Sequence, residues 1–253
     1  MTEGAGRVPD FDDPNLSVLD ELALIYAEQG YRLALTGGAL RDYLMGRAPQ
    51  DYDLTSDATP DESVRILTGW AGSAQRSPNG FGVVTCAHQG LKIQVLTFRT
   101  PRDRFPGYDP ARLHADPLVD QLSCADVTIH TAALVLPTRE WLDPFGGEAD
   151  VRARVLRTPI DPVVTISSYP PTMLRYARFA AQLDFRVAPE VMSAMTALAG
   201  LIEENLTWHA AASLSKILMS PKPEVGMAVL RDSGILDHLP RSWQQRFGHI
   251  GAA

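Results

Sequence analysis

Several features that mark whole classes of protein are scarce in this sequence of 253 residues. It has two cysteines, Cys86 and Cys124, and neither lies in a C-x-x-C pair or a Cys/His cluster. This excludes a disulfide scaffold and a zinc site of the usual spacing. No apolar run approaches the roughly 18 residues of a membrane span, and the acidic first residues hold no apolar stretch of the kind found in secretory signals. We therefore expect a cytoplasmic protein without membrane association.

Positive charge is also in short supply. The chain has 23 Lys and Arg against 30 Asp and Glu, a formal net charge of −7 at pH 7. This balance argues against a broad basic surface for nucleic acid, although a local basic patch stays compatible with it. What the sequence does have is apolar content: 45% of its residues are hydrophobic, which excludes a disordered chain.

The two parts of the chain differ in pattern. Residues 16–150 alternate short β-rich runs with helical segments, whereas residues 170–240 are helical in pattern almost throughout. We expect an α+β unit followed by a helical unit. Within the first unit the sequence predicts a helix from residue 16 to 26, strands over 31–36 and 50–55, a hairpin over 83–98 and a long proline-rich loop over 100–117.

The segment with the most candidate functional residues starts at Gly37-Gly38, where the first predicted strand ends. A glycine pair between a strand and a helix leaves backbone N–H groups available and lets a phosphate approach closely. Arg41, in the first turn of the predicted helix, adds a guanidinium for the same phosphates. An ordinary tight turn with a surface arginine is the alternative.

Asp51 and Asp53 follow this turn. Strand residues two apart share a face, with Cα atoms roughly 6.5–7 Å apart. Two carboxylates on one face repel each other unless a cation lies between them, and divalent metals that also bind nucleotide phosphates fit this need. An isolated pair would more simply be a solvated acidic turn, but the preceding glycine pair favours a metal site.

Gly37-Gly38-Ala39-Leu40-Arg41-Asp42 followed by Asp51-Tyr52-Asp53 resembles the signature of class II tRNA nucleotidyltransferases (CCA-adding enzymes) and bacterial poly(A) polymerases, which belong to the polymerase-β-type superfamily. The resemblance continues, in order, through Phe81-Gly82-Val83-Val84, Val95-Leu96-Thr97-Phe98-Arg99, Asp143-Pro144-Phe145-Gly146-Gly147, Leu174-Arg175, Arg178-Phe179-Ala180-Ala181, Glu203-Glu204-Asn205-Leu206, Leu218-Met219-Ser220-Pro221 and Ser233-Gly234-Ile235-Leu236. It implies an N-terminal extension over residues 1–15, a catalytic head over 16–150 built on a mixed sheet with flanking helices, and an all-helical neck over 151–253.

The resemblance also implies residue roles. Asp51 and Asp53 would be the catalytic residues and the ligands of two Mg²⁺ ions. The nucleotide, CTP or ATP, would be contacted by Gly37, Gly38, Arg41, Asp126, His130, Tyr169, Thr172, Arg175 and Arg178. An acceptor hydroxyl would attack the α-phosphorus in line and expel pyrophosphate, a reaction that depends on positioning and charge neutralisation.

In the head, the sequence departs from this family at two places. A strand in which the family often has a glutamate carries Gln94, which cannot act as a base. The family's Arg-Arg-Asp-Phe-Thr-Ile-Asn-Ala stretch reads Cys124 to Thr131, so that Asp126 is kept but the arginine pair is not. His130 stands in place of the asparagine, either as a buried histidine with satisfied hydrogen bonds or as a sugar contact.

In the predicted neck, the family's base-reading Glu-Asp-x-x-Arg motif falls on Ser168, Tyr169 and Thr172, none of them charged. These side chains cannot recognise C and A in the way that an acid and an arginine do. Tyr169 would either stack on a base or pack beside the helix start. The resemblance ends near residue 240, and the family's tRNA-binding body and tail find no counterpart.

Three functions are compatible with this pattern. The main prediction is a Mg²⁺-dependent nucleotidyltransferase that acts on a small molecule, with tRNA an unexpected partner for an acidic chain. The alternatives are a catalytically weakened nucleotide-binding protein or partner subunit, and a tRNA 3′-end nucleotidyltransferase. The sequence does not indicate an oligomeric state.

Overall fold

The computed structural model describes residues 11, 13–77, 82–206, 208–241 and 243–244. Most of the predicted extension 1–15, Phe81 of the family-like motif and the end of the predicted neck lie outside the described residues. The chain divides into two compact units: residues 1–103 with 109–152, and residues 104–108 with 153–253. Each is described by itself.

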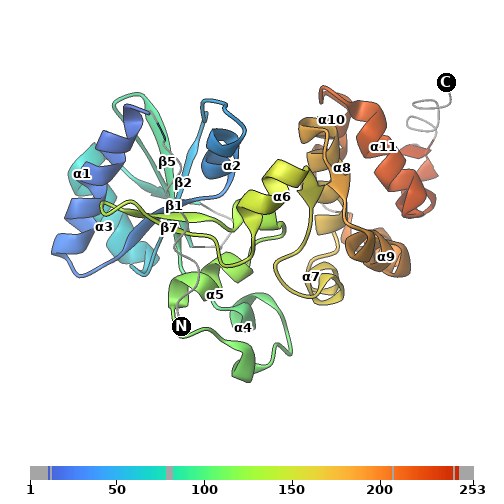
Figure 1. The fold of residues 1–253 in the computed structure, drawn as a ribbon, viewed down its shortest axis with the longest axis horizontal. Helices are drawn as coiled ribbons and strands as arrows, with labels where there is room; N and C mark the ends of the chain where they lie inside the picture. Colours follow the sequence, from blue (N-terminus) through green and yellow to red (C-terminus); the bar gives the residue numbers. More distant parts are fainter. Residues whose placement is uncertain (1–10, 12, 78–81, 207, 242, 245–253) are drawn as a thin grey trace. The chain divides into compact units, whose positions relative to one another are not determined.

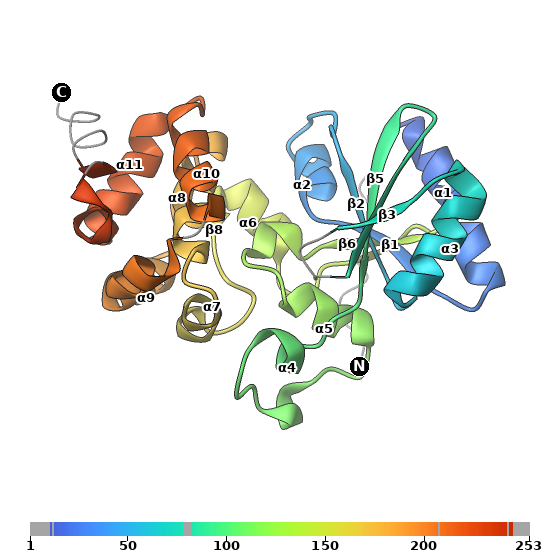
Figure 2. The ribbon, with the colours of Figure 1, turned by 180° about the vertical axis from the view of Figure 1, so that it is seen from behind.

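The first unit is built on a mixed seven-stranded sheet in the order β3-β4-β5-β2-β1-β6-β7 (Figures 1 and 2). Its strands are β1 (Leu33–Thr36), β2 (Tyr52–Ser56), β3 (Gln75–Arg76), β4 (Val83–His88), β5 (Leu91–Thr97), β6 (Ala133–Leu136) and β7 (Glu140–Leu142). The β2–β5 pair is parallel, and the other pairs are antiparallel. The α+β fold is therefore confirmed.

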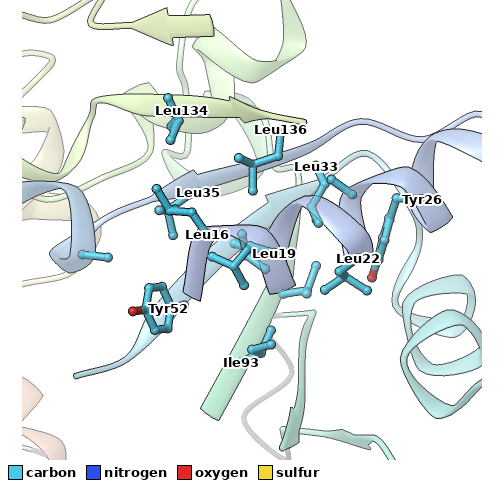
Figure 3. Close-up of a cluster of buried hydrophobic side chains, with 14 of the residues drawn as sticks. Leu16, Leu19, Leu22, Tyr26, Leu33, Leu35, Tyr52, Ile93, Leu134 and Leu136 are labelled. Carbon is cyan, nitrogen blue, oxygen red and sulfur yellow. The ribbon is translucent and has the colours of Figure 1, made fainter. Parts of the chain in front are cut away.

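One face of the sheet is covered by α1 (Asn15–Glu28) and α3 (Pro60–Ala71). The predicted first helix is present, and its apolar residues recur three or four positions apart, so one stripe of the helix faces the strands. Figure 3 shows this core. Fully buried side chains of α1 lie against buried strand residues. Those of α1 are Leu16, Leu19, Leu22 and Tyr26, and those of the strands include Leu33, Leu35, Tyr52 and Ile93.

The opposite face carries α5 (Pro117–Ser123), whose Leu118 and Leu122 pack against Ala34 and Ala133 of the sheet. The chain between the strands also forms α2 (Gly38–Leu44) and α6 (Gly147–Ala153), and a 3₁₀ turn η2 (Thr128–His130). The predicted loop over 100–117 holds two short helical turns, α4 (Pro101–Arg104) and η1 (Pro110–Arg112). A proline at or near the start of each turn explains them, because proline is compatible with the first turn of a helix but not with its interior.

The second unit consists mainly of helices: α7 (Pro162–Ser168), α8 (Thr172–Leu183), α9 (Pro189–Leu198), α10 (Trp208–Leu218) and α11 (Pro223–Asp232), with the 3₁₀ turns η3 (Ala199–Asn205) and η4 (Ile235–His238). The structure adds one short parallel pair, β8 (Val155–Leu156) with β9 (Arg186–Val187), that the helical pattern did not predict. Helix α11 packs closely on α8 at Gly226, where an added Cβ would lie 2.6 Å from the Ala177 carbonyl oxygen.

Across the described ranges, the helices are all too short or too polar to cross a lipid bilayer.

Candidate functional site

The glycine pair forms the turn between β1 and α2. Gly37 has φ 74° and ψ −139°, a backbone conformation that a residue with a side chain rarely adopts. A Cβ built at Gly37 would lie 3.4 Å from the Asp53 Oδ2 atom. The absence of a side chain at this position therefore lets the backbone turn tightly directly beside the Asp53 carboxylate.

Asp53 faces away from the main core. It pairs with Thr36 in the antiparallel β1–β2 register, and its neighbours Tyr52 and Leu54 are buried in the cluster beneath α1. Because strand side chains alternate, Asp53 belongs to the sheet face that carries α5. In the parallel β2–β5 register Gln94 stands beside Asp53, where the family often has a glutamate.

Asp51 lies in a bend just before β2, since that strand begins at Tyr52 rather than at residue 50 as predicted. Its side chain is 54% exposed, and its Oδ1 atom is 3.8 Å from Lys92 Nζ. Desolvation of the Asp53 carboxylate raises the Asp53 pKa above its usual value, and the negative charge of Asp51 raises it further. The positive charges of Lys92 and Arg41 oppose this effect only in part.

Asp51 and Asp53 could supply the protein ligands of a Mg²⁺ ion that substrate phosphates and water complete. In the part of the chain that the structure describes, no cluster of three or more His, Cys, Asp and Glu side chains could hold a metal by itself. Two carboxylates are nevertheless the usual protein share of a Mg²⁺ site whose other ligands are water and substrate phosphates. The repulsion between Asp51 and Asp53, seen in the raised Asp53 pKa, is one that a divalent cation would relieve.

Arg41 is held by two neighbours. Its Nε and Nη2 atoms donate to Asp42 Oδ1 at 2.9 and 2.7 Å, and its Nη1 atom lies 2.8 Å from His130 Nε2. The guanidinium lies against the glycine turn, since a Cβ at Gly38 would be 3.4 Å from Arg41 Nη2. The structure thus brings together Gly38, Arg41 and His130, which the sequence predicted as nucleotide contacts.

A hollow of about 210 Å³ opens on the same side of the sheet. Its lining includes Gly37, Asp53, Gln94, Arg99, Ala125 and His130. Gln121 also lines it and accepts a hydrogen bond from the Arg99 backbone N–H at 2.8 Å. Sequence reasoning missed Gln121, because nothing in the pattern of α5 marks which of its polar residues faces the sheet.

Asp126, the other predicted contact in this unit, is only 6% exposed and lies two residues before η2. The positions of the family's arginine pair are filled by Cys124, which is buried, and Ala125. Both line the hollow, so that the cationic contribution of its lining comes from Arg99 instead.

The remaining predicted contacts belong to the helical unit. Thr172, the first residue of α8, is fully buried, and Tyr169 directly follows α7 with its ring 5.6 Å from Arg104 Cζ. Arg175 and Arg178 flank the Phe179 ring, with their Cζ atoms 5.9 and 4.7 Å from its centroid. The Tyr169 ring therefore contacts a cation of its own unit, and its two predicted roles, stacking on a base and packing beside the helix start, stay predictions.

Comparison with known proteins gives a consistent picture. Residues 33–157 match the family model described as the poly A polymerase head domain. The chain is 35% identical over 223 residues to the multifunctional CCA protein of Pseudomonas paraeruginosa (84% of this chain, 51% of that protein) and 28% identical over 217 residues to the CCA-adding enzyme of Geobacillus sp. (84% and 52%). It thus spans about half the length of the curated relatives it matches.

Among solved structures, the CCA-adding enzyme of Bacillus stearothermophilus in complex with CTP superposes with a TM-score of 0.80. The superposition covers 95% of this chain and 58% of that one, at 24% sequence identity. This likeness shows that the two chains share a fold over the head and the helical region.

Proposed function

Because this chain belongs to the family of CCA-adding enzymes and poly(A) polymerases, we propose that it is a Mg²⁺-dependent nucleotidyltransferase that adds a nucleoside monophosphate from CTP or ATP to the 3′ end of tRNA. The observation that carries the proposal is the position of the Asp53 carboxylate against the Gly37 turn. This position supports the proposal, because the carboxylate that would bind the metal lies beside backbone that only a residue without a side chain leaves open to a phosphate.

The acceptor in this proposal differs from the small molecule that the sequence favoured. Both relatives named above act, by their names, in CCA addition, and this supports the tRNA alternative. The small-molecule prediction relied on the net charge of −7 and on a family resemblance that ends near residue 240, before any counterpart of the tRNA-binding body and tail. Net charge is a sum over the whole chain, whereas an acceptor end meets only the residues around the site, where Arg41 and Arg99 lie.

In the proposed reaction, the 3′ hydroxyl oxygen forms a bond to the α-phosphorus, the bond from that phosphorus to the β-phosphate oxygen breaks, and pyrophosphate leaves. Asp51 and Asp53 would hold Mg²⁺, which when bound supplies charge neutralisation of the triphosphate. The Gly37–Gly38 backbone and the Arg41 guanidinium would orient the phosphates. The hydroxyl proton leaves to solvent rather than to the side chain at position 94, because Gln94 has no titratable group.

The test is incorporation of labelled CTP or ATP, with Mg²⁺, into tRNA that ends at the base before CCA and into tRNA that ends in CC. We expect extension of at least one of these RNAs and its reduction on the order of 100-fold in Asp53→Asn. Asp61→Asn is the matched control, because Asp61 is 90% exposed on α3 and pairs with Arg76. It should extend RNA at the rate of the unmodified protein.

Two results would overturn the proposal. Pyrophosphate release without RNA extension, in the presence of a small hydroxyl acceptor, would restore the small-molecule reaction. Binding of CTP and ATP with no transfer to any acceptor would identify a nucleotide-binding protein that has lost turnover.

A further inference from the structure

We propose that His130 is a positioning residue of this site: as a neutral imidazole it accepts a hydrogen bond from Arg41 and, together with Asp42, holds the guanidinium against the Gly37–Gly38 turn. The proposal rests on the proposed function, since it assigns Arg41 to the triphosphate. It concerns a residue at which this sequence departs from the asparagine of the family that it resembles.

The chemistry of the contact decides which partner donates. Arg41 Nη1 and His130 Nε2 are 2.8 Å apart, the distance of a full hydrogen bond. A guanidinium carries only donors, so Nε2 must be the acceptor and the proton of the neutral ring is on Nδ1. A doubly protonated ring has no acceptor and carries a positive charge, so it cannot make this bond to Arg41.

The Arg41 guanidinium is held at two edges. Asp42 holds the Nε and Nη2 side of the guanidinium, and His130 holds Nη1, so the two partners grip it from two edges. The Arg41 side chain is mostly buried, at 15% exposed. A long flexible side chain fixed in this way loses little further conformational entropy when a phosphate binds. Nη1 and Nη2 each carry one further N–H, which is left for a phosphate oxygen.

The location of His130 also suits a residue that positions Arg41. It ends η2 and lines the hollow that contains Gly37 and Asp53, whereas Arg41 comes from α2 on the other side of the contact. Its charged neighbours on α2 are Arg41, hydrogen-bonded to Nε2, and Asp42, hydrogen-bonded to the same guanidinium. Asp53 and Arg99 line the same hollow, Asp126 precedes η2 in the chain, and Asp150 of α6 accepts a hydrogen bond from Thr128 of η2. The arginine on Nε2 is the group that a proton on that nitrogen would displace.

The experiment measures KM for CTP (or for ATP, if that is the substrate used) between pH 5.5 and 8 in the unmodified protein and three variants. In the unmodified protein KM should rise toward the acid end of this range, below the usual imidazole pKa of about 6.5, because the bond from Arg41 favours the neutral ring. His130→Asn keeps an acceptor that does not titrate and should remove this rise. His130→Leu keeps no acceptor and should show a KM about tenfold higher throughout, with kcat changed less.

His88→Asn is the control. His88 lies at the turn end of the β4–β5 hairpin, opposite Leu91, whereas the hollow is lined by Val83 and Leu96 at the other end. This variant should keep the pH profile of the unmodified protein, including any part that comes from titration of the nucleotide itself.

The opposite change of KM with pH would overturn the inference. If His130 were a cationic phosphate ligand, KM would fall on acidification in the unmodified protein, and His130→Asn would abolish that fall. Equal KM in His130→Leu and the unmodified protein would show that the contact has no role in binding. A protein that transfers no nucleotide and binds no CTP or ATP at any pH would instead overturn the proposed function, because the unmodified protein is then inactive before any variant is compared.

Discussion

Gly37, in the turn after β1, lies beside Asp53 of the neighbouring strand β2, and a Cβ on the glycine would lie 3.4 Å from the aspartate Oδ2 atom. A methyl group there would contact a carboxylate that we propose as a metal ligand and would cover the backbone that we propose for the phosphates. Gly37→Ala should therefore lower both stability and nucleotide transfer, the first by about 1–3 kcal/mol because φ 74° with ψ −139° is strained for a residue with a side chain.

The control for this prediction is Gly30→Ala. Gly30 has φ 84°, but no atom lies within 4 Å of a Cβ added there. Both glycines have a positive φ, but only Gly37 lies against Asp53. Urea unfolding should show a loss of stability in both variants, whereas initial rates of CTP incorporation should fall only in Gly37→Ala. Equal effects on the rate would mean that the contact with Asp53 does not matter.

A second prediction concerns the packing of α11 on α8. A Cβ at Gly226 would lie 2.6 Å from the Ala177 carbonyl oxygen and 2.9 Å from both Ala181 Cβ and Ile217 Cγ2. These are buried backbone and short side chains that cannot move aside. Gly226→Ala should lower the free energy of unfolding by about 1–3 kcal/mol, as other overpacking substitutions do.

Gly69→Ala on α3 provides the contrast, since a Cβ there meets nothing within 4 Å. In this exposed helix interior alanine should stabilise by up to about 1 kcal/mol. Thermal or chemical unfolding of both variants tests whether Gly226→Ala lowers stability and Gly69→Ala raises it. A neutral or stabilising Gly226→Ala would contradict the close helix crossing.

A third prediction concerns stability in acid. Partial burial opposes ionisation of Asp13, but hydrogen bonds from the Tyr43 and Tyr52 hydroxyls and from the Asn15 backbone N–H outweigh it and lower the Asp13 pKa. The ionised form is thus favoured in the folded state. Its contribution to stability is present above the unfolded pKa of about 3.9 and is lost as the pH falls through the lower folded value.

Asp13→Asn should therefore be less stable than the unmodified protein at pH 7, and the difference should shrink below pH 4. Tyr52→Phe removes one donor to the carboxylate, at 2.6 Å in the structure, and should reproduce part of the effect. Unfolding in urea from pH 2.5 to 7 measures both. A difference that stays constant down to pH 2.5 would show that the carboxylate charge has no part in it.

The elements that the sequence predicted well are those with a local signal. The apolar stripe of α1 and the β4–β5 hairpin are encoded in residues a few positions apart, and Gln89-Gly90 adopts the positive φ values that its turn needs. The order of the α+β and helical parts follows from the same local patterns.

The predictions that missed depend on contacts distant in sequence. The start of β2 at Tyr52, which leaves Asp51 in a bend, is set by pairing with β1 and β5 rather than by the composition of residues 50–55. The contact between Arg41 and His130 joins positions 89 residues apart. The sequence identified both residues as candidates, yet only the folded chain shows that one holds the other.

The central claim is that Asp51, Asp53 and the Gly37–Gly38 turn together hold a nucleoside triphosphate with its metal. The most direct measurement is anomalous diffraction from a crystal grown with CTP and Mn²⁺ as a probe for Mg²⁺. Our account predicts an anomalous peak at the Asp51 and Asp53 carboxylates, with the triphosphate density running along the glycine turn. Nucleotide density with no metal at these two carboxylates, or a metal bound elsewhere in the chain, would contradict it.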